Sequence, residues 1–166
     1  MIEVRRQALV TAEVECILRS VGSTLEPLTA IGREVGAAAG KDMAERIEQL
    51  GDLPVGGAVI TPAGDLSASF IIHVALQSHE EPVSAGGVRK ALRNGLSYAC
   101  RMGIETLALP PLGTGAGNLD AEAAADVMCE VLRDHMRNEE YPREITVMVT
   151  TDYELQAFVS RLEELV

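Results

Sequence analysis

The chain has 166 residues, 47% of them hydrophobic, and we expect residues 1–166 to fold as a single well-packed domain. Its formal charge of −11 repels polyanions, so a nucleic acid is not an expected partner. No stretch approaches the roughly 20 apolar residues of a membrane span, and the first ten residues lack the apolar core of a signal peptide. We therefore expect a cytoplasmic protein that does not enter a membrane.

In the first half of the chain, stretches with the apolar pattern of a β-strand occur on both sides of a stretch with the apolar spacing of a helix. Alternating apolar residues predict strands over Ile2–Val10 and Val14–Val21. Helical spacing then predicts one helix from Leu28 to Leu50, with its end at Gly51. Two short runs rich in β-branched residues, 56–64 and 69–76, predict strands that are buried on both faces.

The second half continues the alternation of helices and strands. Its predicted helices and strands are a helix from Ser84 to Met102, a strand over 104–110, a helix capped by Asp120, a strand over 144–150 and a helix over 152–166 capped by Asp152. Such an order predicts a three-layer α/β/α sandwich with a mixed, mainly parallel central sheet.

The three cysteines, Cys16, Cys100 and Cys129, lie far apart in apolar helix or strand patterns. An odd number of cysteines in such positions favours reduced buried thiols over disulfides or a zinc site. The sequence therefore predicts neither a bound metal nor a cofactor.

A glycine-rich segment between the strand at 104–110 and the following helix is the strongest candidate binding site. Its residues are Leu112, Gly113, Thr114, Gly115, Ala116, Gly117 and Asn118. Glycine permits positive φ and close approach of a ligand, so successive N–H groups can form a concave anion site at the start of the helix. The spacing matches neither the P-loop nor the dinucleotide fingerprint. From spacing alone, a tight turn without a ligand explains the glycines equally well.

The segments 56–74 and 87–128 resemble the macro domain family, whose members share an apolar strand ending in Ile-His and a strand that leads to a glycine-rich loop. The resemblance covers about Val55–Val131 well and is weaker toward both ends. It implies the same α/β/α sandwich, which recognises ADP-ribose or related metabolites and in several branches hydrolyses ADP-ribose derivatives, as in Appr-1-p processing. Leu112–Asn118 would then wrap the diphosphate and the distal ribose through backbone N–H groups.

The first part of the chain departs from the family pattern. Gln7, Ala8 and Leu9 stand where active members often have Gly-Asp-Ile, whose Asp binds adenine. Arg19–Gly22 stands where the family has Asn-Ala-Ala-Asn, whose last Asn helps to position the distal ribose and water. A glycine hydrogen at Gly22 cannot replace an amide in that role.

A second departure concerns the start of the first long helix, where the family has Gly-Gly-Val. Thr29, Ala30 and Ile31 stand at these positions, and with Gly22 they are the expected wall of the first-loop pocket. Their side chains would crowd a phosphate site lined by backbone. Near the last strand-to-helix junction, Tyr153 is the candidate for stacking on a base, and a half-buried tyrosine covering the sheet edge is the alternative.

The histidines do not supply a substitute catalytic set. His73 lies in the apolar run 70–76 and is predicted to be a core or strand-end histidine with hydrogen-bond partners. His79 stands beside Glu80 and Glu81, a pattern that favours a solvated acidic loop over a metal site. His135 is expected near a helix C-terminus.

Three functions remain open. The favoured one is a module that binds ADP-ribose or a related phosphate-bearing nucleotide metabolite without efficient hydrolysis. The second is an ADP-ribosyl ester hydrolase with a rearranged site. The third is a ligand-free protein-interaction or dimerisation domain, for example in a homo-oligomer, whose pocket would be closed by the side chains of Arg19, Thr29 and Ile31.

Overall fold

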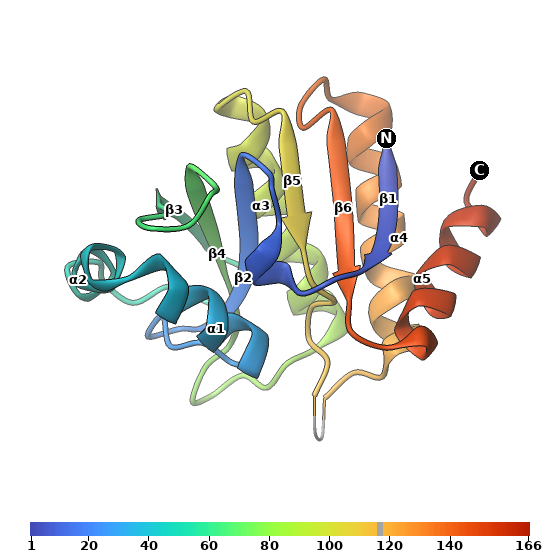
Figure 1. Ribbon diagram of the computed structural model, residues 1–166. Helices are drawn as coiled ribbons and strands as arrows, with labels where there is room; N and C mark the ends of the chain where they lie inside the picture. The colour runs from blue at the N-terminus through green and yellow to red at the C-terminus, as the bar shows by residue number, and fades with distance from the viewer. Residues whose placement is uncertain (116–117) are drawn as a thin grey trace.

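The computed structural model describes residues 1–115 and 118–166, which form one six-stranded sheet flanked by helices (Figure 1). The strands are β1 (Ile2–Arg6), β2 (Cys16–Gly22), β3 (Ala58–Pro62), β4 (Phe70–Gln77), β5 (Thr106–Leu109) and β6 (Glu144–Val149). The helices are α1 (Ala30–Ala39), α2 (Lys41–Glu48), α3 (Ala85–Arg101), α4 (Ala121–Asn138) and α5 (Asp152–Glu164), with a 3-10 turn η1 (Leu9–Thr11). Within these described ranges, no helix is long and apolar enough to cross a membrane.

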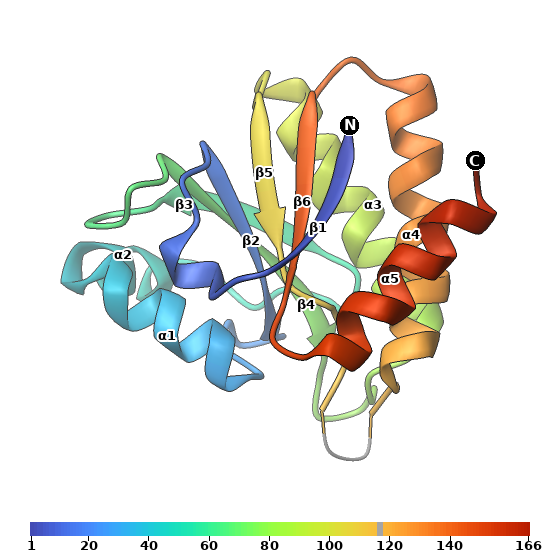
Figure 2. The ribbon, with the colours of Figure 1, turned by 45° about the vertical axis from the view of Figure 1, so that its right-hand side comes forward.

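The strand order is β1-β6-β5-β2-β4-β3, and β3 alone runs antiparallel to its neighbour. Helices α1 and α2 cover one face of the sheet, and α3 and α4 cover the other, with α5 packed beside α4 and β1 (Figures 1 and 2). This arrangement is the three-layer α/β/α sandwich with a mixed sheet that the sequence predicts. Because both faces of the central strands are covered, those strands are hydrophobic almost without interruption.

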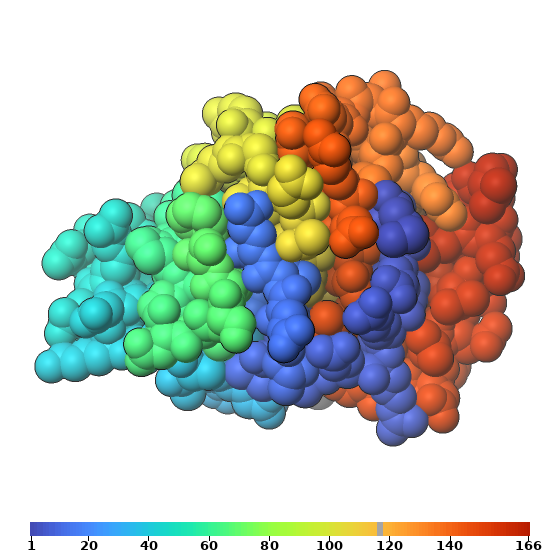
Figure 3. All heavy atoms as spheres, turned by 45° about the horizontal axis from the view of Figure 1, so that its top comes forward, coloured from blue at the N-terminus to red at the C-terminus, as the bar shows by residue number. Residues whose placement is uncertain are grey.

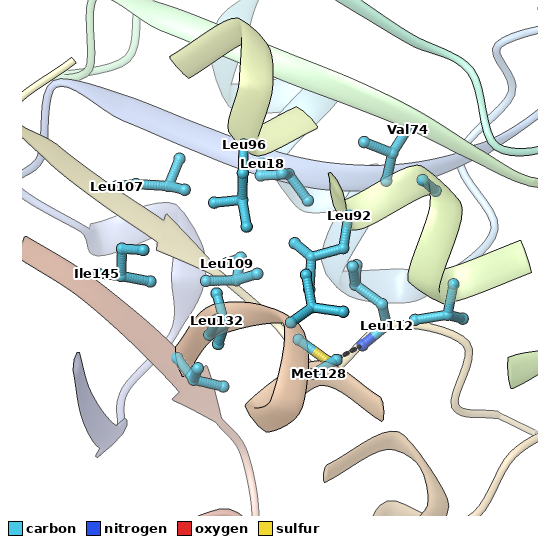
Figure 4. Packing of buried hydrophobic residues seen from close by; sticks show 14 of the residues in the cluster. Leu18, Val74, Leu92, Leu96, Leu107, Leu109, Leu112, Met128, Leu132 and Ile145 are labelled. Carbon is cyan, nitrogen blue, oxygen red and sulfur yellow. Dashed lines mark hydrogen bonds between the residues drawn. The ribbon is translucent and has the colours of Figure 1, made fainter. Parts of the chain in front are cut away.

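The larger part of the core lies between the sheet and the α3–α4 layer (Figure 4). There Leu18 and Leu107 from the sheet pack with Leu92 and Leu96 of α3, and all four side chains are fully buried. Each such leucine stabilises the fold by roughly 1.5–3 kcal/mol relative to exposure. The smaller part of the core, around Ile17, lies under α1 and η1.

The prediction of one helix over Leu28–Leu50 is wrong, because the chain forms two helices that are separated at Gly40. Gly40 has φ +91° and ψ −170°, which takes the backbone out of the helical region. A Cβ built on Gly40 would lie 2.6 Å from an Asp65 carboxylate oxygen. The second helix ends at Glu48, before Gly51, so the expected end signal is not the one used.

Several other predicted boundaries are also wrong. β1 ends at Arg6 because the chain turns into η1, where Leu9 enters the core. Thr151, and not Asp152, is the N-cap of α5: its side chain accepts from the N–H of Glu154, whose carboxylate accepts from the N–H of Thr151.

Two of the three cysteines, Cys16 and Cys129, are buried as expected. Cys100 departs from the expectation of a buried thiol. It is only partly buried, and its Sγ donates to Glu139 Oε2 at 3.4 Å. Asp120 does cap α4 as predicted, since its Oδ1 accepts from the N–H of Ala123 at 2.8 Å.

Glycine in the middle of α3 lets the helix approach the sheet, which gives a test of the packing. A Cβ built on Gly95 would lie 2.9 Å from Leu18 Cδ1 and 3.1 Å from Val74 Cγ1. We expect Gly95→Ala to lower the free energy of unfolding by about 1–2 kcal/mol, because overpacking costs about 1–3 kcal/mol and exceeds the gain in helix propensity. Urea unfolding measures the change.

The matched control is Gly86→Ala, in the first turn of the same helix, where a new Cβ meets nothing within 4 Å. Its free energy of unfolding should stay constant or rise by up to about 1 kcal/mol. Equal stabilisation by both substitutions would contradict the close packing of α3 on β2 and β4.

Candidate functional site

The candidate site lies where the chain leaves β2 and β5 in opposite directions. These neighbouring parallel strands pair at Cys16–Leu107 and Ile17–Ala108. β2 leads to α1 on one face of the sheet, and β5 leads to α4 on the other (Figure 2). Such a divergence predicts a crevice at the carboxyl ends of the strands, where ligands of α/β proteins usually bind, and we refer to this position as the β2–β5 crevice.

The loop after β5 forms one wall of this crevice. Gly113 and Gly115 have φ +80° and +134°, conformations that favour glycine. The N–H of Leu119 donates to Gly113 O at 3.0 Å, and an isolated bridge pairs Thr114 with Leu119. Among the described residues, the N–H groups of Gly113 and Thr114 have no acceptor, as an anion-binding nest requires. Ala116 and Gly117, also predicted for this site, lie outside the described residues.

The base of the same loop is fixed by the core. The N–H of Leu112 donates to Met128 Sδ at 3.2 Å, and its side chain is fully buried (Figure 4). A Cβ on Gly113 would lie 2.8 Å from Val88 Cγ2. Gly115 is exposed, and among the described residues a Cβ there would meet only Asn118 Nδ2, at 3.7 Å. Gly113 is therefore fixed by the core, whereas the described surroundings of Gly115 leave room for a side chain.

The start of α4 adds further donors beside the loop. Asp120 caps the N–H of Ala123, but within the described part of the chain the N–H groups of Ala121 and Glu122 have no acceptor. The first turn of a helix also carries the positive end of the helix dipole. Both features favour an anion next to the glycine loop.

The loop after β2 forms the opposite wall and uses its donors internally. The N–H of Gly22 donates to Glu26 O at 2.8 Å, and that of Leu25 to Gly22 O at 2.9 Å. Leu25 adopts φ +69°, and Ser23 N–H donates to Gln77 O of β4 at 2.8 Å. This closed turn leaves none of these three N–H groups free for a phosphate.

A carboxylate occupies the space beside Gly22, a feature that the sequence did not suggest. A Cβ built on Gly22 would lie 1.9 Å from Glu26 Oε1, so the Glu26 side chain takes the place of a side chain at residue 22. The hydroxyl of Thr24 donates to the other oxygen, Glu26 Oε2. Residue-by-residue comparison with a family motif does not show such a substitution, because the carboxylate comes from four residues further along.

The start of α1 contains the other residues predicted for the first-loop pocket. Thr29 is the N-cap of α1, and its Oγ1 accepts from the N–H of Gly32 at 3.0 Å. Ile31 is partly buried and packs against the smaller part of the core, whereas Ala30 is exposed. The structure brings these residues to the same edge of the sheet as Gly22. Their contact with a ligand stays a prediction.

Arg19 lies between the sheet and α1 and is 3% exposed. Its Nε donates to His73 Nδ1 at 2.9 Å, and its Nη1 donates to Gly32 O at 3.0 Å. No carboxylate in the described ranges forms a salt bridge with it, and burial lowers the pKa of Arg19 to about 10. Gly36 makes room for the guanidinium, since a Cβ there would lie 2.9 Å from Nη1. These hydrogen bonds hold the Arg19 side chain between the sheet and α1, and its part in closing the pocket, as in the third hypothesis, stays a prediction.

His73 is the fully buried core histidine that the sequence predicts. Its Nδ1 accepts from Arg19, so the proton of the neutral ring is on Nε2, which lies 2.9 Å from Thr61 Oγ1. Burial, with a smaller contribution from the charge of Arg19, lowers the pKa of His73 to about 3. The imidazole is neutral and engaged at both nitrogens, so it does not serve as a proton-transfer group.

The residues predicted for the base end lie further along the same edge. Gln7 Nε2 donates to Thr11 Oγ1 at 3.0 Å, and Ala8 O accepts from the same hydroxyl. Tyr153 is exposed, and its hydroxyl donates to Glu122 Oε1 at 2.7 Å. Tyr153 also lines a cavity of about 340 Å³ between α4 and α5. Its stacking on a base stays a prediction.

The neighbouring loop after β4 is a tight turn in which Ser78 Oγ accepts from the N–H groups of Glu80 and Glu81. His79 in this turn is exposed, in keeping with a solvated acidic loop. His135 is in the last turn of α4, and its Nε2 lies 2.8 Å from the carbonyl oxygen of Tyr141.

The buried His73 predicts a pH dependence of stability. Its pKa is lower in the folded protein than in the unfolded chain, so the unfolded chain binds an extra proton between about pH 6.5 and pH 3 and stability falls as the pH falls. From pH 7 to pH 5, wild type should lose about 2 kcal/mol more than His73→Asn, which keeps an acceptor for Arg19. Urea unfolding at both pH values measures this difference, and equal losses would contradict a neutral buried imidazole.

Comparisons with known proteins agree with this architecture. The family model of the macro domain matches residues 21–128. A macro domain-containing protein of Caldanaerobacter subterraneus is 27% identical, with 95% of this chain and 93% of that protein covered. An O-acetyl-ADP-ribose deacetylase of Enterobacter cloacae is 29% identical, with coverages of 87% and 84%.

Solved structures show the same fold. A point mutant of the Oceanobacillus iheyensis macrodomain with ADPR superimposes with a TM-score of 0.88 at 17% identity, over 99% of this chain and 92% of that one. The Trypanosoma brucei macrodomain in complex with ADP-ribose gives a TM-score of 0.86 at 14% identity, with coverages of 96% and 68%. The match over most of the chain, together with the glycine loop at the β2–β5 crevice, shows that this chain belongs to the macro domain family.

Proposed function

We propose that the chain binds ADP-ribose or a related phosphate-bearing nucleotide metabolite in the β2–β5 crevice, without efficient turnover. The observation that carries the proposal is the pair of N–H groups of Gly113 and Thr114, which have no acceptor in the described part of the chain and lie beside the start of α4. Two solved macrodomain structures, one with ADPR and one in complex with ADP-ribose, support this choice of ligand.

Backbone donors suit a phosphate in this otherwise acidic protein. N–H groups bind an anion without a lysine or arginine, and hydrogen bonds to a charged acceptor are worth about 1.5–3 kcal/mol each. The formal charge of −11 does not attract an anion over a distance, so affinity has to come from direct contacts. A site built from fixed N–H groups meets that requirement.

The geometry gives little support to efficient catalysis. His73 is neutral and engaged, and burial raises the thiol pKa values of Cys16 and Cys129 to about 12, so these groups supply neither a base nor a thiolate. The second candidate function is ester hydrolysis on an ADP-ribose derivative. It is favoured by the Enterobacter relative, which is named a deacetylase, and by the Glu26 carboxylate beside Gly22.

Isothermal titration with ADP-ribose tests the proposal. We expect saturable binding near the micromolar range for wild type and its loss in Gly115→Glu, which places a carboxylate on the exposed loop tip. AMP and ribose 5-phosphate serve as separate ligands, and chromatography of the mixture after incubation reports any turnover. Product formation by wild type would favour the hydrolase over the binding module.

Gly103→Glu is the matched control for the substitution at the loop tip. Gly103 also has positive φ, +65°, and a Cβ there meets nothing within 4 Å, so charge and backbone strain change in a similar way. The turn between α3 and β5 that contains it (yellow at the upper left of Figure 3) lies at the top of Figure 1, opposite the loops that follow β2 and β5. Absence of heat from all three ligands in folded wild type, or equal loss in both variants, would contradict the proposal.

A further inference from the structure

We infer that the Glu26 carboxylate is the hydroxyl-recognising group of the crevice, so that the preferred ligand is a phosphorylated sugar with free hydroxyls. The inference rests on the proposed function and narrows it: recognition is centred on the sugar-phosphate end and not on the base. It assigns a specificity-determining role to a residue outside the segments that resemble the family motifs.

The first step is the position of the carboxylate. β2 ends at Gly22, and β5 ends at Leu109, four residues before Gly113. Because β2 and β5 are neighbouring parallel strands, the loops that contain these two glycines leave the sheet at the same edge. Because Glu26 Oε1 lies 1.9 Å from the position of a Cβ on Gly22, the carboxylate is held at the carboxyl end of β2.

The second step is the fixation of this side chain. The backbone of the turn is closed by the hydrogen bonds between Gly22 and Glu26 and between Leu25 and Gly22. The Thr24 hydroxyl holds Oε2, whereas no donor from the described residues reaches Oε1. One oxygen is thus oriented by the protein and the other is available, an arrangement that lowers the entropic cost of binding a ligand.

The third step is the chemistry of the two walls. An ionised carboxylate only accepts hydrogen bonds and repels phosphate, so Glu26 favours hydroxyl groups. The wall formed by Gly113 and Thr114 presents two N–H donors that have no acceptor among the described residues, and such donors favour phosphate. A ligand with a phosphate at one end and sugar hydroxyls at the other satisfies both walls at once.

The base end has weaker support from the structure. Ala8 replaces the Asp that the family resemblance assigns to adenine, and the Tyr153 hydroxyl is bound to Glu122. Specific polar recognition of a base is therefore not evident at these two residues. This leaves the sugar-phosphate end as the part of the ligand that the described side chains and N–H groups can distinguish.

The test compares two phosphate monoesters, ribose 5-phosphate and methyl phosphate, by titration and ligand-observed NMR. Wild type should bind ribose 5-phosphate at least tenfold more tightly, because a hydrogen bond to a charged acceptor contributes on this scale. Glu26→Gln should reduce that ratio by roughly tenfold while keeping or improving the affinity for methyl phosphate. A merely structural role of Glu26 would change both affinities together.

Two further variants sharpen the comparison. Gly22→Ala keeps the charge of Glu26 but displaces its carboxyl, since the new Cβ would collide with it, and should lose the same discrimination. Glu34→Gln, on the exposed side of α1, makes the same charge change as Glu26→Gln and should keep the wild-type ratio. Thermal unfolding confirms that each variant is folded.

The outcomes separate this inference from the function on which it rests. Equal affinity of wild type for the two esters, or an unchanged ratio in folded Glu26→Gln and Gly22→Ala, overturns the role of Glu26 and leaves phosphate binding intact. If folded wild type binds neither ester, the inference is overturned, and if ADP-ribose also fails to bind, the proposed function is overturned as well.

Discussion

Neighbouring strands β2 and β5 are followed by helices on opposite faces of the sheet, and the position of the candidate site depends on this divergence. Two side-by-side parallel strands whose helices lie on the same face would leave no crevice between their loops. Here the loops after β2 and β5 emerge together and then separate. Every group that the site can use, whether N–H, carboxylate or helix end, is placed by that separation.

The two walls of the crevice differ because their backbones are used differently. The loop after β2 uses the N–H groups of Gly22, Ser23 and Leu25 in internal hydrogen bonds, and the loop after β5 leaves those of Gly113 and Thr114 without acceptors in the described chain. A buried unpaired N–H costs roughly 1–3 kcal/mol, so such groups are expected where water or a ligand can reach them. The walls are therefore chemically complementary to each other.

The Arg19 guanidinium is buried beneath α1 without a carboxylate partner among the described residues. Its hydrogen bonds offset part of the free-energy cost of removing this charge from water. Arg19 reaches Gly32 O because Gly36, one turn further along α1, has no side chain there, and it reaches His73 because the two residues are paired in β2 and β4. The neutral His73 accepts the hydrogen bond that an acidic residue would usually accept. Burial lowers the pKa of Arg19 to about 10 and the pKa of His73 to about 3.

Most of the fold could be predicted from the period of the apolar residues. That period reports which face is buried, and a continuous run such as Ile71–Leu76 has few alternatives to a buried strand. The break at Gly40 could not be predicted, because the apolar pattern continues through it and only the contact with Asp65 and the backbone angles show it.

The candidate site was less predictable than the fold. Composition and spacing indicated the glycine loop, because positive φ is a local property of glycine. The pairing of Arg19 with His73 depends on the register of β2 and β4, which places the two residues side by side. The carboxylate beside Gly22 depends on a closed turn that brings residue 26 back over residue 22. Neither of these two contacts can be deduced from the local sequence.

The glycines of the two loops also differ in whether the fold tolerates a side chain in their place. At Gly113, positive φ and the 2.8 Å approach of Val88 tie the residue to the core, so a side chain there would disturb the fold. Gly22 has no positive φ, and the atom that a Cβ would meet is the end of the flexible Glu26 side chain. A substitution at residue 22 therefore moves a carboxylate and costs little stability. A side chain at residue 22 is thus compatible with the fold, whereas one at residue 113 is not, and this explains how the glycine-rich loop can face a loop that departs from the Asn-Ala-Ala-Asn pattern.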